Sequence, residues 1–221
     1  MDFSSIDITA ISSKRNGKKK EEDEETADQD RVRVKKSLNA HQTRRILSEA
    51  ALEQELPWHF EPNATYHCIS MGDVDALTYL RVIVKQQPIE YCLLSTWCMA
   101  NTDIEEIGKW LEAGYIKHMD FYVGEIFTSR YASEWQVLKS IVQKHGGRVA
   151  LFRNHSKVMA GFGRDFDFSI ASSANVNTNP RTEQATITLD TDVAMFYKDF
   201  YDGIKSFDHN FDDWKPYTIR R

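Results

Sequence analysis

The sequence predicts an α/β domain, an α-β-α sandwich in which a mixed central sheet lies between layers of helices. From Pro62 onward, short apolar runs of strand length alternate with longer amphipathic runs of helix length. Proline or glycine follows most of the helix-like runs. The last strand-like runs follow one another closely, which favours antiparallel pairing, whereas strands separated by a helix favour parallel pairing.

The expected elements follow from these runs. Strands are predicted at residues 65–70, 89–96, 118–123, 148–152, 156–161, 166–172 and 185–189. Helices are predicted at residues 73–86, 103–113, 126–145 and 192–207. Thr102 is expected to cap the second of these helices, with Glu105 completing a capping box.

A charged segment and a short helix precede this domain. Residues 1–40 carry nine Lys or Arg and nine Asp or Glu residues, a composition typical of a disordered tail. The basic runs of this tail could contact DNA or a protein partner, and a solvated tail is the alternative. We expect residues 41–62 to form a helical arm and linker, residues 63–210 the folded domain, and residues 211–221 a C-terminal tail.

The composition limits the class of protein. With 41% hydrophobic and 12% aromatic residues among 221, the chain can bury one core. Because the charges of the tail cancel, the remaining residues carry the whole net charge of -5, and a generally basic surface is excluded. Phosphate binding therefore requires a local patch. Its candidates lie close together in the sequence: Arg148, Arg153, Lys157, Arg164 and Arg181.

Two further observations concern location and cysteines. Neither a signal peptide nor an apolar run long enough to span a bilayer is evident, so we expect a cytoplasmic protein that does not enter the membrane. Cys68, Cys92 and Cys98 lack the spacing of a metal site, and we expect them to be reduced core residues.

Five polar residues point to chemistry. His155 and Lys157 adjoin the apolar run that starts at Val158, and Ser173 and Asn175 follow the next apolar run. Two adjacent antiparallel strands would bring these positions together. Residues two apart on a strand share a face, so His155 and Lys157 should point the same way.

These residue types suit attack on a phosphodiester. His155 can be the nucleophile, Lys157 and the Asn175 amide can bind the non-bridging oxygens, and Ser173 can orient or donate. Glu183 is expected to hold the second ring nitrogen of His155. Each of these residues has a structural alternative. Histidines are often hydrogen-bonded residues of the surface or core without a catalytic role, serine is common in turns, and Glu183 could be a charge at the edge of a strand.

In the order His155-x-Lys157, Ser173-x-Asn175, Asn179-Pro180-Arg181 and Glu183, the chain resembles the phospholipase D superfamily over residues 65–207. It is most similar to the small nucleases that carry a single His-x-Lys motif. The resemblance implies a phospholipase D-like sandwich and a homodimer with one active site shared between two chains. Two positions differ from the family pattern: Phe162 stands where an Asp is common, and Ser172 where a Gly is common.

The resemblance implies a metal-independent phosphodiesterase acting on nucleic acid, an endonuclease, with DNA preferred to RNA. His155 of the second chain would protonate the leaving group. We expect neither a metal nor a cofactor, because Lys157 and Asn175 of both chains neutralise the phosphate. Arg153, Arg164, Arg181 and Trp97 are expected to bind substrate, with a core role as the alternative for Trp97. A phospholipid phosphodiesterase, or a non-catalytic scaffold that binds DNA or a partner, remains as an alternative function.

Overall fold

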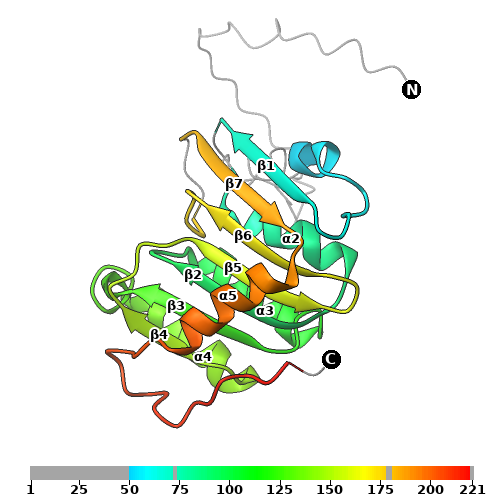
Figure 1. Cartoon of the computed structure of the whole chain (residues 1–221). Coiled ribbons are helices and arrows are strands. Elements are labelled where there is room, and N and C mark those ends of the chain that lie inside the picture. Colours follow the sequence, from blue (N-terminus) through cyan, green and yellow to red (C-terminus); the bar gives the residue numbers. More distant parts are fainter. Residues whose placement is uncertain (1–49, 72–73, 178–180, 220–221) are drawn as a thin grey trace, which may run out of the picture. The chain divides into compact units, whose positions relative to one another are not determined.

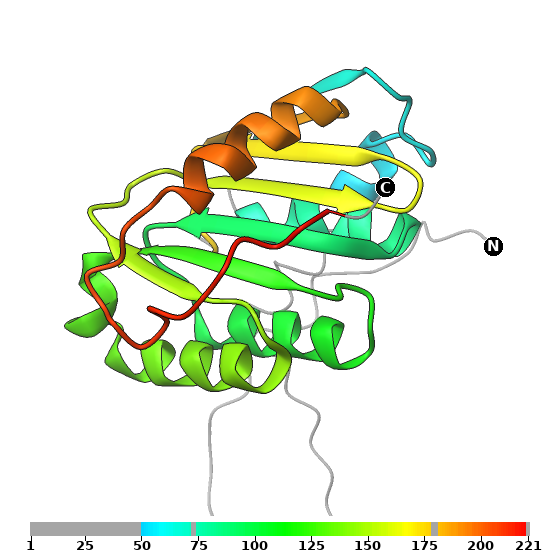
Figure 2. The ribbon, with the colours of Figure 1, turned by 60° about the horizontal axis from the view of Figure 1, so that its bottom comes forward.

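The computed structural model describes residues 50–71, 74–177 and 181–219. The expected tail at residues 1–40 and the first part of the helical arm lie outside the described residues. Within residues 50–55 the arm is helical, as expected. One seven-stranded sheet, in the order β1-β7-β6-β5-β2-β3-β4, has helices on both faces (Figures 1 and 2). The expected mixed sandwich is therefore confirmed.

The bounds of the elements lie close to the predicted ones. The strands are β1 (Thr65–Ser70), β2 (Ile89–Thr96), β3 (Met119–Gly124), β4 (Val149–Phe152), β5 (Val158–Gly163), β6 (Asp167–Ser172) and β7 (Glu183–Thr188). The helices are α2 (Ala76–Gln86), α3 (Asn101–Glu112), the 3-10 helix η2 (Glu125–Thr128), α4 (Ala132–His145) and α5 (Thr191–Asp202). The helix at 50–55 precedes β1.

The sheet has a parallel half and an antiparallel half. β2, β3 and β4 are parallel, because a helical crossover separates each from the next. β5, β6 and β7 pair antiparallel, as expected for strands joined by short connections, and β1, distant in sequence, pairs antiparallel with β7. The two halves meet where β2 pairs antiparallel with β5, with Ser95 opposite Val158. The carboxyl end of β2 therefore lies beside the start of β5.

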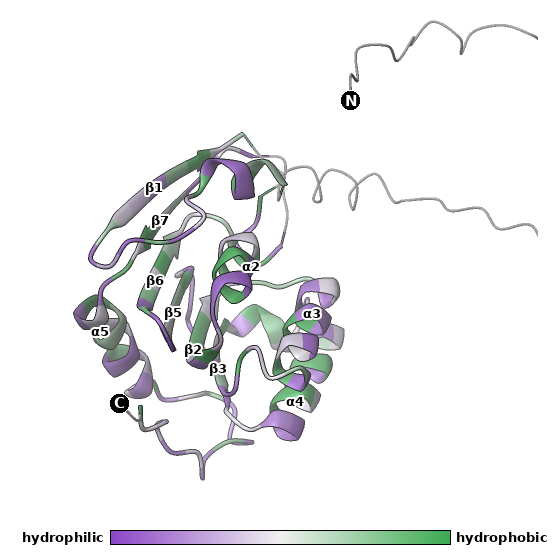
Figure 3. Ribbon diagram, turned by 90° about the vertical axis from the view of Figure 1, so that its right-hand side faces the viewer, coloured by the Kyte–Doolittle hydropathy of each residue, from purple (hydrophilic) through white to green (hydrophobic). Residues whose placement is uncertain are grey.

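Both faces of the sheet are buried. In β2, Cys92 and Leu94 belong to the core under α2, α3 and α4, whereas Tyr91 and Leu93 belong to the core under α5. Burial on both sides explains why β2 is continuously apolar rather than alternating. The hydropathy colours of Figure 3 show the same division, with apolar helix faces turned toward the sheet.

Two expected helix features are wrong. The predicted helix at 126–145 is broken into η2 and α4, because the Ile126 carbonyl accepts the N–H groups of Ser129 and Arg130 at 3.2 and 2.9 Å and closes a tight turn. The capping box of Thr102 and Glu105 does not form. The helix α3 begins earlier, after Ala100, with no side-chain cap.

The segment after α5 packs on the sheet. The predicted last helix ends at Asp202 rather than at 207, and residues 203–219 run back across β3 and β2 (red in Figure 2). Trp214 Nε1 donates to the buried Asp120 carboxylate at 3.1 Å, and the Tyr217 ring stacks on Tyr91 with centroids 5.2 Å apart. Residues 211–219, expected to be a tail, thus contribute to the interior of the α5 side.

Arg148 holds this segment in place. Its side chain is buried, and its guanidinium donates to the carbonyls of Tyr201 and Ile204 at 2.8 and 3.2 Å. The guanidinium also lies 3.7 Å from the centre of the Trp214 ring. The expectation that Arg148 belongs to a phosphate-binding patch is wrong, because the C-terminal segment covers it.

The cysteines form no disulfide, as expected of reduced residues, although Cys68 is only half-buried. All three cysteines are free, Cys92 and Cys98 are buried, and burial raises the pKa of the Cys98 thiol above its ordinary value. Among the helices of the described residues, none combines the length and the apolar character needed to cross a membrane.

We predict that Arg148→Met lowers the free energy of unfolding by about 2–4 kcal/mol, because it removes buried charge-assisted hydrogen bonds and leaves carbonyls unpaired. The measurement is the midpoint of urea unfolding. The matched control is Arg153→Met, an exposed arginine, which should change stability by no more than about 0.5 kcal/mol. Equal effects of the two substitutions would contradict the structural role of Arg148.

Candidate active site

The expected site residues gather at one edge of the sheet. This edge holds the carboxyl ends of β2, β3 and β4, the start of β5, the end of β6 and the start of β7 (Figure 1). Ligands of open α/β sheets commonly bind at the carboxyl ends of the strands, where the strand order changes direction. Here that point is the junction of β2 with β5.

The His-x-Lys motif lies in a loop rather than on a strand. β5 begins at Val158, so His155 and Lys157 occupy the connection that leads into it. Asn154 is buried, at 4% exposure, whereas His155 and Ser156 are exposed and Lys157 is half-buried. Lys157 Nζ lies 3.3 Å from His155 Nδ1, so the imidazole and the ammonium share one side of the loop, as expected.

Asn154 and Ser156 hold the other side of this loop. The Asn154 amide donates to Ser95 Oγ and to the carbonyls of Thr96 and Tyr122, at 2.9, 3.2 and 2.8 Å. Its carbonyl oxygen accepts from the Ser156 N–H at 3.0 Å and from the Ser156 hydroxyl at 2.6 Å. The loop is thereby tied to the ends of β2 and β3.

The indole of Trp97 lies against His155. The two ring centroids are 5.5 Å apart and tilted by 48°. Trp97 follows β2 directly and is half-buried, so it is not a core residue, and its role in substrate binding stays a prediction. Gly124 at the end of β3 makes room for it, because a Cβ there would come within 2.8 Å of Trp97 Cδ1.

Ser173, Asn175 and Glu183 reach the same edge from β6 and β7. The backbone N–H of Ser172 donates to the Lys157 carbonyl at 2.9 Å, which joins the end of β6 to the motif loop. Asn175 Oδ1 faces the Thr96 hydroxyl at 3.4 Å, which leaves the NH₂ group as the donor toward the site.

The Glu183 carboxylate accepts a hydrogen bond from the Ser173 hydroxyl. The hydrogen bond of the His155 ring involves Lys157. The pairing of Glu183 with the His155 ring stays a prediction. Ser173 and Glu183 together place one hydroxyl and one carboxylate beside the motif, at the start of β7.

Burial lowers the pKa of the Lys157 ammonium below its ordinary value, because the charged form loses hydration. The negative charge of Glu183 and the Cys98 thiol nearby act in the opposite direction. Lys157 is therefore close enough to Glu183 for their charges to interact.

The arginines divide into two groups. Arg153 adjoins the motif and Arg181 precedes β7, and both are exposed at the candidate edge. Arg164 pairs with Asp165 at 3.0 Å in the β5–β6 hairpin, at the far end of β5. A strand of this length carries it roughly 20 Å from the motif. Arg164 therefore does not reach a phosphate bound at the motif, and a contact with another part of the substrate stays a prediction.

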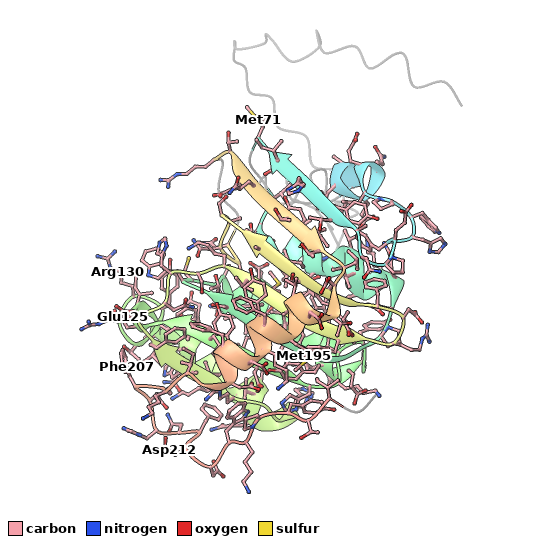
Figure 4. All side chains as sticks on the ribbon, viewed as in Figure 1. Met71, Glu125, Arg130, Met195, Phe207 and Asp212 are labelled. Atoms are coloured by element: carbon pink, nitrogen blue, oxygen red, sulfur yellow. The ribbon has the colours of Figure 1, made fainter. Side chains whose placement is uncertain are left out.

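Sequence reasoning missed Arg130. It follows η2 at the carboxyl end of β3, is exposed, and projects with Glu125 from the same end of the domain (Figure 4). The sequence could have indicated Arg130 because it follows a strand that ends at the site edge. It was overlooked because it lies far from the motif in the sequence.

Phe162 occupies the position where the family pattern often has an Asp. Its ring is buried at 1% exposure in the core under α5, with its centroid 6.2 Å from that of Tyr91. An aspartate could not replace it there without burying a charge. The described residues contain no group of three or more His, Cys, Asp or Glu side chains placed to hold a metal ion.

Comparison with known proteins finds similarity in fold. No family model matches the sequence, and no curated protein matches it. Among solved structures, the chain is similar to a phosphatidylserine synthase of Haemophilus influenzae, with 14% identity, TM-score 0.45, and 62% of this chain and 37% of that one covered. It is similar to a polyphosphate kinase of Porphyromonas gingivalis, with 13% identity, TM-score 0.49, and 71% and 27% covered.

A third similar structure is NucT of Helicobacter pylori, with 15% identity, TM-score 0.45, and 62% of this chain and 94% of that one covered. At these identities the likeness is one of fold. The matched part of this chain spans about a third of the synthase and about a quarter of the kinase.

We predict that Gly124→Ala displaces Trp97 from His155 and lowers stability by about 1–3 kcal/mol, because the added methyl group has no room. The measurements are the thermal midpoint and the ¹H–¹³C spectrum of labelled tryptophan. The matched control is Gly203→Ala, where the nearest atom would lie at an ordinary 3.5 Å. If Gly124→Ala were as neutral as the control, the close approach of Trp97 would be wrong.

Proposed function

We propose that this protein hydrolyses phosphodiester bonds of nucleic acid as an endonuclease, through a phosphohistidine intermediate, with DNA preferred to RNA. One observation supports the proposal above the others. His155 and Lys157 project together from a loop in which the preceding side chain, Asn154, is buried and the intervening side chain, Ser156, is hydrogen-bonded to it. A nucleophile and a cation held side by side suit an anionic substrate that resists attack.

In the first step, a deprotonated ring nitrogen of His155 attacks phosphorus, and the bond from phosphorus to the leaving oxygen breaks. Lys157 and the NH₂ group of Asn175 bind the non-bridging oxygens as their charge changes. Lys157 must exchange its contact with His155 for one with phosphate. Ser173, bonded to Glu183, is available to orient the same oxygens.

In the second step, water attacks the phosphohistidine, the phosphorus–nitrogen bond breaks, and His155 is regenerated. Each step needs a proton donor or acceptor on the opposite side of phosphorus. The motif occurs once in the chain. We therefore propose a homodimer in which His155 of the second chain protonates the leaving oxygen and then deprotonates water.

The surroundings of the motif favour a polynucleotide. Trp97 provides an aromatic ring on which a base could stack beside the scissile phosphate. Arg153 and Arg181, exposed at the same edge, can bind the flanking phosphates. Lys157 and Asn175 of the two chains together stabilise the negative charge of the bound phosphate, as a metal ion does in other phosphodiesterases.

We predict that His155→Ala abolishes cleavage of labelled oligonucleotides while binding is retained, and that wild-type cleavage persists in EDTA. The matched control is His209→Ala, an exposed histidine of the C-terminal segment, which should leave the rate unchanged. Wild-type reactions quenched with denaturant at alkaline pH, where a phosphorus–nitrogen bond survives, should contain an oligonucleotide fragment bonded through its phosphoryl group to His155. Loss of activity in EDTA with recovery in Mg²⁺ would overturn the metal-free mechanism.

The shared site has its own test. Mixing His155→Ala with wild-type protein should give heterodimers in which one chain supplies the nucleophile and the other chain lacks the acid. The mass of the protein in solution should correspond to two chains. A fully active monomer would contradict the shared site. No hydrolysis of DNA, RNA or a phospholipid by the wild type, with binding unchanged in His155→Ala, would identify a scaffold instead.

We predict an alkaline limit to activity below the ordinary lysine pKa of about 10.4, because burial lowers the pKa of Lys157 and only its charged form binds phosphate. Activity is thus present below the pKa of Lys157 and is lost as the pH rises through it. The measurement is kcat/KM against pH. Lys157→Arg, which stays charged, should retain partial activity without that limit; an unchanged limit would exclude Lys157 as its source.

A further inference from the structure

The interior side of the motif loop is organised around the Ser156 hydroxyl. Its oxygen lies 2.7 Å from Ser95 Oγ, 2.6 Å from Asn154 Oδ1 and 2.7 Å from the hydroxyl of Tyr201. Ser95, Asn154 and Tyr201 are all buried. These contacts join β2, the motif loop and α5 at a single atom, directly beneath His155.

The chemistry of the groups fixes the direction of these hydrogen bonds. A serine hydroxyl donates one hydrogen and accepts up to two, and Asn154 Oδ1 can only accept. Ser156 therefore donates to Asn154 and accepts from Ser95 and Tyr201. Ser95 in turn accepts from the Asn154 amide at 2.9 Å. Tyr201 is thus the donor that completes the bonding of Ser156.

Tyr201 is itself held at both ends. Its carbonyl accepts from the Arg148 guanidinium at 2.8 Å, and its hydroxyl donates to Ser156. Its ring packs on Tyr122, with centroids 4.7 Å apart. The same Arg148 contacts Trp214 of the C-terminal segment. The position of the Tyr201 hydroxyl is therefore set by α5, β4 and the C-terminal segment together.

We propose that Tyr201 is a positioning residue for the reaction: through Ser156 it fixes the loop from which His155 and Lys157 project. Phe162, on the strand that follows the loop, is buried and has no group that could hydrogen-bond to the loop. The polar contacts that hold the loop come instead from Ser95, Asn154 and Tyr201. The consequence for hydrolysis rests on the proposed function, whereas the consequence for the His155 ring does not.

The test compares Tyr201→Phe with Tyr197→Phe, the same substitution one turn earlier on α5, where the half-buried ring contacts Phe196. Tyr201→Phe removes one hydroxyl and keeps the ring. It should lower kcat roughly 10- to 100-fold through misplacement of the nucleophile, with KM nearly unchanged. Tyr197→Phe should behave as the wild type in both.

A second measurement does not need activity. The ¹H–¹³C resonances of the His155 ring carry a ring-current shift from Trp97, whose centroid lies 5.5 Å away. They are assigned by their absence from the spectrum of His155→Ala. Tyr201→Phe should shift them toward the values of a free histidine, and Tyr197→Phe should not.

A third variant keeps the proposal testable if Tyr201→Phe is unstable. Ser156→Ala breaks the same link from the loop side and also removes the hydrogen bonds to Ser95 and Asn154, so it should lower kcat and shift the His155 resonances at least as much. Because the link to Tyr201 is already lost in Ser156→Ala, the double variant should be no slower than that single variant. Independent, multiplying losses would overturn the direct link.

The outcomes separate the two proposals. If the wild type hydrolyses nothing but the His155 resonances move in Tyr201→Phe alone, the positioning role stands and the proposed function falls. If those resonances coincide with the wild-type ones, or if kcat is unchanged in an active enzyme, the positioning role is wrong. A fall in thermal midpoint with kcat and resonances unaltered would likewise reduce Tyr201 to a purely structural residue.

Discussion

The pairing of β2 with β5 is the constraint on which the candidate site depends. Opposite Ser95 stands Val158, so the residues that follow β2 and those that precede β5 must lie side by side. Trp97 thereby meets His155, and Ser95 meets Ser156. Because a change of register by one residue would turn every side chain to the other face, the apolar cores on both sides of the sheet also fix the polar site.

The loop between β4 and β5 could not hold its geometry without the buried polar groups beneath it. An unpaired polar atom in the interior costs about 1–3 kcal/mol, so such groups are tolerated only when their hydrogen bonds are complete. The Asn154 amide and the Ser156 hydroxyl meet this condition through partners on β2, β3 and α5. The same bonds that satisfy the interior direct the alternate residues, His155 and Lys157, outward. The same hydrogen bonds therefore stabilise the fold and orient the side chains of the site.

The sequence predicted the regular elements well where local pattern decides them. The bounds of β1 and β2 coincide with the predicted ranges, because β-branched and aromatic residues end at clear breaks. The prediction from sequence was wrong where contacts between distant residues determine the bounds of an element. The N–H of Ala100 bonds to the carbonyl of Val176 at 3.0 Å, so α3 starts before the expected cap. No local pattern contains that contact.

The candidate site shows the same division between local and distant information. The motif residues were found from short spacings, because adjacent strands bring their ends together. Ser95 and Tyr201 were not found, since they lie 61 and 45 positions from Ser156 and look like ordinary polar residues of a strand and a helix. Arg148 and Arg164 were misjudged for the opposite reason, because their closeness to the motif in the sequence suggested closeness in space. Arg148 is buried in the structure, and Arg164 lies at the far end of β5.

The revised position of the arginines changes the electrostatic argument for substrate binding. With Arg148 buried and Arg164 at the far end, the cations near the candidate edge include Arg130 after η2, Arg153 and Lys157 in the connection between β4 and β5, and Arg181 before β7. In a chain of net charge -5, the folded domain can attract a polyanion only through such a local group of cations. Few phosphate contacts imply weak non-specific affinity, and the proposed second chain would double the number of cations around one phosphate.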